Sequence, residues 1–238
     1  MLIIENEFNA VIDRKIIKEN EENEHTPSGK LSASSLGQPL QWQVLKYLAV
    51  KNDCLKMPEY DAYTLRKFKR GKDVESRILD YFDCDKQIDC EYRDCVGVID
   101  AIIDTKEFDF DFGEIPFEIK SVTSLKFKYI NKSNKFQEEH ALQGCLYALA
   151  TGKEKFGLVY VNADDYRCKV FILDVADFKH IVDAVIDRYN YAIENKIIPV
   201  FEPIADWQKD PKYQKFPEFA ELTNEQIHEK IESLGIKF

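Results

Sequence analysis

The chain has 238 residues, is 45% hydrophobic and carries a formal net charge of −10 at pH 7. Its length and apolar content allow one large domain with a substantial core. Its apolar runs, such as residues 156–161, are too short to cross a bilayer, so we expect no membrane partner. The charge argues against a protein that coats nucleic acid through bulk positive charge, because such binding neutralises many phosphates.

The first residues predict a cytoplasmic protein, in the host cytoplasm if the source is viral. They lack the basic start, apolar centre and small-residue cleavage site of a secretory signal. The six cysteines are therefore expected to be reduced thiols. The spacing of Cys84, Cys90 and Cys95 matches no common zinc pattern, so we expect no structural zinc.

Residues 1–31 are expected to form an N-terminal extension and mobile linker, because residues 20–31 are mostly polar, aperiodic and interrupted by proline and glycine. The core domain is expected to span residues 32–197. Helix-start residues followed by apolar residues at helical spacing predict its first helix over residues 32–50, and a second helix is expected over residues 61–82.

The pattern then changes to runs rich in branched residues, which indicate strands. The predicted elements, in chain order, are strands at 87–92, 96–104 and 115–122, a helix at 136–151, strands at 156–161 and 168–175, and a helix at 176–195. Residues 198–238 are expected to form a Pro-rich C-terminal extension that packs on the core and ends in a short helix. This order predicts a mixed α/β (α+β) fold with a central mixed sheet of about five strands flanked by helices.

Asp100 and Glu118 each interrupt an otherwise apolar strand, where a carboxylate is costly to bury without a partner. Alternation along a strand places Glu118 and Lys120 on one face. If the two strands are neighbours, both carboxylates meet and can hold Mg²⁺ or Mn²⁺, which would activate a water molecule for hydrolysis. The alternative is a strand-ending aspartate and an ordinary exposed sheet edge.

Four short motifs resemble, in order, those of the PD-(D/E)xK nuclease superfamily. They are Gly-Lys-Asp-Val-Glu at 71–75, Gly-Val-Ile-Asp at 97–100, Glu-Ile-Lys at 118–120 and Gln-Gly-Cys-Leu-Tyr at 143–147. The stretch from Ser32 to Asn195 is similar, within that superfamily, to RecB-like and exonuclease V-like nucleases. The resemblance implies a restriction-endonuclease-like core and metal-dependent hydrolysis of DNA, with Asp100, Glu118 and Lys120 as catalytic residues.

The resemblance also implies a role for each motif residue. Asp100 and Glu118 would bind the metal, Glu75 and the carbonyl of Ile119 would add ligands, and Lys120 would assist the attacking water. Independently of the family, Glu75 lies near the middle of the apolar arc of its helix and is expected to face inward. The alternative is a solvated acid paired with a basic neighbour.

Gln143 and Tyr147 lie one helical turn apart, and the resemblance makes them groups that position DNA or orient the lysine. The alternative is ordinary polarity at the edge of the core. Basic residues interleaved with aromatic ones precede this helix and are expected to follow a phosphate backbone, or else to form a solubilising loop. These residues are Lys126, Lys128, Lys132 and Lys135.

Many RecB-like nucleases carry a C-terminal cysteine cluster for an iron–sulfur centre. No cysteine follows Cys168 here, so we expect no such centre. The chain also lacks a phosphate-binding nucleotide loop, so any translocation would come from a helicase, single-strand-binding or recombination partner.

The preferred interpretation is an exonuclease that acts on single- or double-stranded DNA ends in replication, recombination or repair, in a phage or mobile element for example. A structure-specific endonuclease, an inactive nuclease-like module that binds DNA or protein, and an acidic interaction protein with an accidental resemblance are the alternatives.

Overall fold

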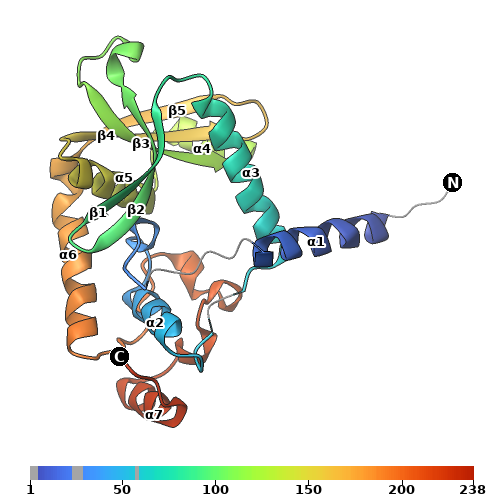
Figure 1. Cartoon of the computed structure of the whole chain (residues 1–238), viewed down its shortest axis with the longest axis vertical. Helices are drawn as coiled ribbons and strands as arrows, with labels where there is room; N and C mark the ends of the chain where they lie inside the picture. The colour runs from blue at the N-terminus through green and yellow to red at the C-terminus, as the bar shows by residue number, and fades with distance from the viewer. Residues whose placement is uncertain (1–4, 23–28, 57–58) are drawn as a thin grey trace.

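The computed structural model of the chain describes residues 5–22, 29–56 and 59–238. A five-stranded sheet with the order β1-β2-β3-β4-β5 forms its centre (Figure 1). The strands are β1 (Asp85–Tyr92), β2 (Cys95–Asp104), β3 (Glu114–Val122), β4 (Lys155–Asn162) and β5 (Cys168–Asp174). Strands β3 and β4 are parallel and the other pairs are antiparallel. The predicted mixed sheet of five strands is confirmed.

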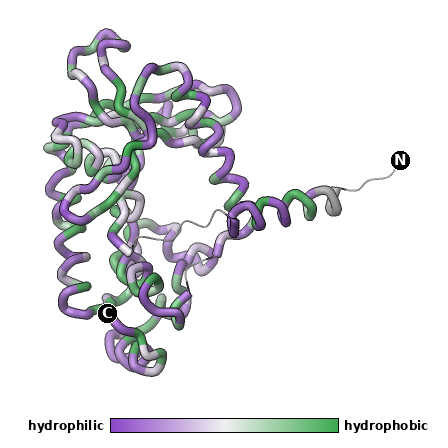
Figure 2. Tube along the Cα trace, in the orientation of Figure 1, coloured by the Kyte–Doolittle hydropathy of each residue, from purple (hydrophilic) through white to green (hydrophobic). Residues whose placement is uncertain are grey.

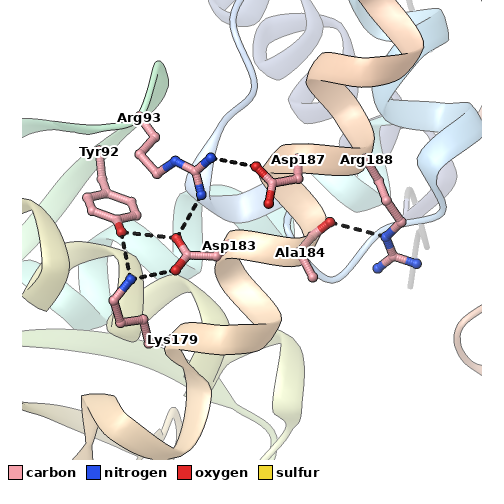
Figure 3. Close-up of polar contacts among 7 residues, drawn as sticks. All are labelled: Tyr92, Arg93, Lys179, Asp183, Ala184, Asp187 and Arg188. Carbon is pink, nitrogen blue, oxygen red and sulfur yellow. Dashed lines mark hydrogen bonds and ion pairs between the residues drawn. The ribbon is translucent and has the colours of Figure 1, made fainter.

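Strands β1 and β2 form a hairpin whose turn residues, Arg93 and Asp94, have φ angles of 50° and 65°. Two successive turn residues with positive φ give the turn a twist that matches the twist of the two strands. A polar network then attaches this turn to α6 (Val175–Glu194) (Figure 3). Asp183 accepts hydrogen bonds from Tyr92 Oη at 3.0 Å, Arg93 Nη1 at 3.0 Å and Lys179 Nζ at 2.5 Å. The network holds the outer hairpin against the long helix.

Helices cover both sides of the sheet (Figure 1). On one side, α3 (Ala62–Leu79) buries Val74 and Ile78 in a cluster with side chains of β2, β3 and β4. On the other, α5 (Glu138–Thr151), α6 and α2 (Leu40–Lys51) share a larger core. Figure 2 shows the tube of α6 changing between purple and green, as expected for a helix with one buried face.

The first predicted helix begins later than expected. Residues from Ser32 onward form only a short 3₁₀ helix (Ala33–Ser35), and α2 begins after Pro39, which occupies its N-cap. Gly37 lies between the two helices against Glu139, whose Cβ would be 2.3 Å from a Cβ added there. Because the chain must turn sharply at this point, one continuous helix from residue 32 does not form.

A further helix, α4 (Ser124–Ser133), occupies the basic segment after β3, where the sequence analysis predicts no regular element. Its N-cap, Thr123, accepts a hydrogen bond from the backbone N–H of Lys126, and Asn134 ends it in the left-handed conformation. Phe127 and Ile130, three residues apart, are buried against β4. Only two buried apolar positions mark this helix, which is too few for a recognisable period.

The two ends of the chain attach differently. Helix α1 (Glu5–Glu22) contacts α3 through the ion pairs Asp13–Arg66 and Glu19–Lys69 and projects from the rest of the molecule (Figure 1). It includes residues 20–22 of the expected linker, and residues 23–28 lie outside the described residues. The tail after α6 buries Phe216 and Phe219 in the core that α2 and α5 share, and ends with α7 (Asn224–Leu234).

Within the described ranges, no helix is long and apolar enough to cross a membrane.

Candidate active site

The antiparallel pairing of β2 with β3 brings Asp100 to Glu118. Ala101 pairs with Phe117, so the next positions along this register are Asp100 and Glu118. The Asp100 carboxylate accepts a hydrogen bond from the backbone N–H of Ile119 at 2.7 Å, in place of a ladder bond. Both side chains line a cavity of about 710 Å³. Its lining also includes Glu75, Ile119, Lys120, Gln143 and Tyr147.

Glu118 is the most deeply buried acid of this cavity, with 1% of its surface exposed. It forms an ion pair with Lys120, and neither carboxylate oxygen accepts a well-formed hydrogen bond within the described part of the chain. Burial raises the pKa of Glu118 to about 8, although the charge of Lys120 opposes the shift. A buried carboxylate with unused oxygens is poised to accept a cation.

The pKa values of Asp100 and Glu75, two further acids of the cavity, are also raised. Burial raises the pKa of Asp100, against the opposing effects of the Ile119 N–H and of Lys120. Burial and the charge of Asp100 raise the pKa of Glu75 to about 7. Glu75 comes from α3 and accepts a hydrogen bond from Gln87 Nε2 at 2.6 Å. The three carboxylates therefore belong to one electrostatically coupled group.

The donor set fits a hard divalent cation. Carboxylates and a backbone carbonyl offer only oxygen, which Mg²⁺ and Mn²⁺ prefer. In the described ranges, however, no three His, Cys, Asp or Glu side chains converge closely enough to hold an ion together. Glu118 faces Lys120 and Glu75 faces Gln87. Binding of an ion would therefore require these two carboxylates to turn from their present partners.

Lys120 is held by a hydrogen-bonded chain from α5. Its Nζ donates to Gln143 Oε1 at 3.2 Å, and Gln143 Nε2 donates to Tyr147 Oη at 2.7 Å. Burial alone would lower the pKa of Lys120, but the carboxylates, Glu118 first, raise it above its ordinary value. Tyr147 is only 2% exposed, and burial beside Glu118 raises the pKa of its hydroxyl. This burial favours the lysine-orienting alternative for Gln143 and Tyr147 over direct contact with DNA.

Gly97, in the second motif, allows Tyr147 to reach this position. A Cβ on Gly97 would lie 2.8 Å from Tyr147 Cε1 and 3.0 Å from Ala33 Cβ. The absence of a side chain on β2 therefore lets α5 approach closely enough for the phenol to support Gln143.

We expect Gly97→Ala to displace the phenol of Tyr147 and to destabilise the fold by about 1–3 kcal/mol, the usual cost of overpacking. Urea denaturation followed by circular dichroism measures the change. Gly71→Ala is the matched control, because a Cβ at this position in α3 meets nothing within 4 Å. It should instead stabilise the protein by about 0.5–1 kcal/mol through helix propensity. Equal stabilities of the two variants would contradict the role given to Gly97.

The four lysines of the basic segment lie outside the cavity of Asp100 and Glu118. Lys126 donates to Gln137 Oε1 at 2.7 Å, and burial lowers its pKa. Lys128 and Lys132 are exposed one turn apart on α4, and Lys135 is exposed just after its end. Leu125 and Tyr129, which are 81% and 65% exposed, lie on the same face of α4 as Lys128 and Lys132.

The cavity also contains residues that the sequence analysis did not identify. Ser32, Ser34 and Lys46 line the cavity of Glu118, and Lys215 lines an adjoining one. Lys46 lies on a predicted helix with no motif around it, and Lys215 lies in the tail. No local pattern marks either residue, because their position depends on packing between distant segments.

The fold is similar to that of a solved alkaline exonuclease. LHK-Exo, an alkaline exonuclease from Laribacter hongkongensis, aligns with a TM-score of 0.51 over 71% of this chain and 91% of its own, at 16% identity. Its complex with dAMP aligns with the same score and coverage at 14% identity. A phage-related exonuclease from Haemophilus somnus has a TM-score of 0.44 at 12% identity, over 70% of this chain and 96% of its own. No protein-family model matches the sequence, and a search of curated sequences finds no relative. At these identities the likeness establishes the fold alone.

Proposed function

We propose that the protein is a divalent-metal-dependent deoxyribonuclease, most specifically an exonuclease that acts on DNA ends. The observation that carries the proposal is the ion pair of buried Glu118 with half-buried Lys120 beside Asp100, at the wall of a large open cavity. Burying such charges costs free energy, and an apolar replacement would stabilise the fold at least as well. A catalytic role explains why these two charged side chains lie at this position.

Asp100 and Glu118, with Glu75 and the carbonyl of Ile119, would hold Mg²⁺ or Mn²⁺. The bound ion would lower the pKa of a water molecule and offset charge on the phosphate. Lys120 keeps its proton beside these acids, so its ammonium can donate a hydrogen bond to the attacking water or to a phosphate oxygen. Gln143, fixed by Tyr147, limits the positions that the ammonium can take.

Three observations support DNA ends as the substrate. The fold is similar to that of LHK-Exo, whose complex with dAMP contains a mononucleotide. The order of the four motifs resembles that of RecB-like and exonuclease V-like nucleases, which is the subfamily we propose. The exposed face of α4, with Lys128, Tyr129 and Lys132, offers ammonium groups and a ring to a passing strand. A helicase, single-strand-binding or recombination protein would supply separated strands.

The test is incubation of the protein with linear and covalently closed circular DNA in Mg²⁺, in Mn²⁺ and in EDTA. We expect loss of linear DNA with release of acid-soluble nucleotides in either metal, and no reaction in EDTA. Cleavage of the circular DNA would establish an endonuclease instead. DNA binding without cleavage in any metal would leave only the nuclease-like binding module.

A further inference from the structure

Two lysines beside the candidate active site lack an acidic partner. Lys46 comes from α2, and Lys215 lies in the tail between two short 3₁₀ helices, Pro211–Tyr213 and Pro217–Phe219. Lys215 Nζ donates to Gln38 Oε1 at 2.7 Å, and Lys46 Nζ lies 3.5 Å from Ser32 Oγ. Within the described part of the chain, neither ammonium has a carboxylate oxygen within 4.0 Å.

The two ammonium groups lie close enough to influence each other. Burial lowers the pKa of Lys46. Burial, and then the charge of Lys46, lowers the pKa of Lys215 to about 8. Holding two like charges in a partly buried place without a counter-ion costs free energy. An anion bound between them would remove most of that cost.

Glu139 is the one acid that lines the adjoining cavity with Lys215. Burial raises the pKa of Glu139, and among the lysines Lys126 opposes this shift most strongly, ahead of Lys120 and Lys215. Glu139 also raises the pKa of Lys215, against the larger effects of burial and of the charge of Lys46. Glu139 therefore offsets only part of the positive charge of Lys46 and Lys215.

This pair lies beside two adjoining cavities. Lys46 lines the cavity of about 710 Å³ that contains Glu118, and Lys215 lines the adjoining cavity of about 260 Å³. Ser34, Lys120 and Gln143 line both cavities, so the two adjoin at the candidate catalytic lysine. A strand placed at Glu118 would continue into the smaller cavity, past Lys46 and Lys215.

Trp207 offers an apolar surface at the same place. Its ring lines the smaller cavity, is 44% exposed and is held by Tyr213, with ring centroids 5.7 Å apart. Exposed aromatic rings next to a positive groove are the usual platforms for bases of single-stranded DNA. A phosphate at the lysines and a base on Trp207 are the two parts of one nucleotide.

We propose that the C-terminal tail forms a nucleotide subsite next to the scissile phosphate, in which Lys46 and Lys215 bind a backbone phosphate and Trp207 stacks on the attached base. The ligand is a single DNA strand. The inference rests on the proposed nuclease function, because that function places a strand in the larger cavity. In this arrangement the tail is part of the substrate groove as well as of the core.

The test is fluorescence anisotropy of end-labelled dT12 bound to the full chain, with Ca²⁺ in place of Mg²⁺, at several salt concentrations. For Lys215→Gln we expect affinity about tenfold lower and a salt slope reduced by roughly 0.7, the loss of one phosphate contact to a single strand. Lys209→Gln is the matched control, since it removes the same charge from an exposed tail lysine that pairs with Asp206. It should change affinity less than about twofold, because the charge of Lys209 is already paired with Asp206.

The chain's second tryptophan, Trp42, is 1% exposed, so no base can stack on it, although its ring lies 6.4 Å from that of Trp207. Binding of dT12 should quench the tryptophan fluorescence of the wild type, and this quenching should disappear in Trp207→Phe. Thermal denaturation of each variant verifies folding. Equal affinities and salt slopes for Lys215→Gln and Lys209→Gln, or an unchanged salt slope in Lys215→Gln, would overturn the subsite.

These results are independent of cleavage. If the wild type degrades linear DNA and the Lys215→Gln and Lys209→Gln variants bind dT12 equally well, the subsite is refuted and the proposed nuclease function stands. If the wild type binds dT12 through Lys215 but does not degrade DNA, the subsite stands and the proposed nuclease function is refuted. Absence of dT12 binding by the wild type would overturn the subsite whatever the cleavage result.

Discussion

Glu118→Gln is expected to abolish metal-dependent cleavage of linear DNA, with a loss of about a thousandfold or more. Glutamine keeps the size of the side chain and removes the charge that would hold the metal. A bound ion stabilises the transition state by several kcal/mol, and each 1.36 kcal/mol is a factor of about ten in rate. The measurement is the initial rate of nucleotide release in saturating Mg²⁺ or Mn²⁺.

Glu114→Gln is the matched control for this substitution. Glu114 begins the same strand, is exposed and pairs with Asp104 in the ladder, away from the cavity. Its rate should stay within about twofold of the wild type, as for most exposed surface changes. Lys120→Ala should lose activity as Glu118→Gln does, because both side chains would act on the same reacting group. Full activity of Glu118→Gln in correctly folded protein would remove the proposed catalytic centre.

The metal-free protein is expected to lose stability as the pH rises from about 5 to about 8. Glu118 and Glu75 have pKa values of about 8 and about 7 in the fold, against 4.5 as the ordinary value. Between these limits the folded chain binds more protons than the unfolded chain, so the free energy of unfolding falls with pH. Each such group contributes a slope of up to about 1.4 kcal/mol per pH unit.

A divalent ion should reverse this trend. Carboxylates bind metal in their deprotonated form, so metal binding competes with protons. Adding Mn²⁺ should therefore raise the melting temperature more at pH 8 than at pH 5.5. Differential scanning fluorimetry at both pH values, with EDTA as reference, measures the shift. In Glu118→Gln both the pH slope and the Mn²⁺ effect should shrink. A Mn²⁺ effect that is independent of pH and of Glu118 would place the ion elsewhere.

The sequence determined the parts of the fold that depend on short periods. Runs rich in branched residues at 96–104 and 115–122 predict two strands, and the pleat then sets locally which face each polar side chain takes. The spacing of Glu118 and Lys120 therefore predicts that they meet, and the structure has them as an ion pair. The helix of Gln143 and Tyr147 follows for the same reason, since its apolar stripe spans several turns.

The sequence could not predict elements whose local signal is short or contradicted. Helix α4 buries only two apolar side chains, and its lysines suggest a loop. The start of α2 shifts from residue 32 to Leu40 because Pro39 and the crowded Gly37 interrupt a pattern that propensity would extend. The placement of Lys128 and Lys132 on one face of a helix became visible only with α4.

Tertiary structure alone decided which residues share the cavity. Residue types and spacing indicate Asp100, Glu118 and Lys120, because neighbouring strands and a two-residue period bring them together. The hydrogen-bonded chain from Lys120 through Gln143 to Tyr147 depends on the close approach of α5 to β2 at Gly97. Lys46 and Lys215, which are far apart in the sequence, line adjoining cavities because the tail packs on the core that contains α2. Local sequence carries no signal for such contacts, because they form only when the whole core is assembled.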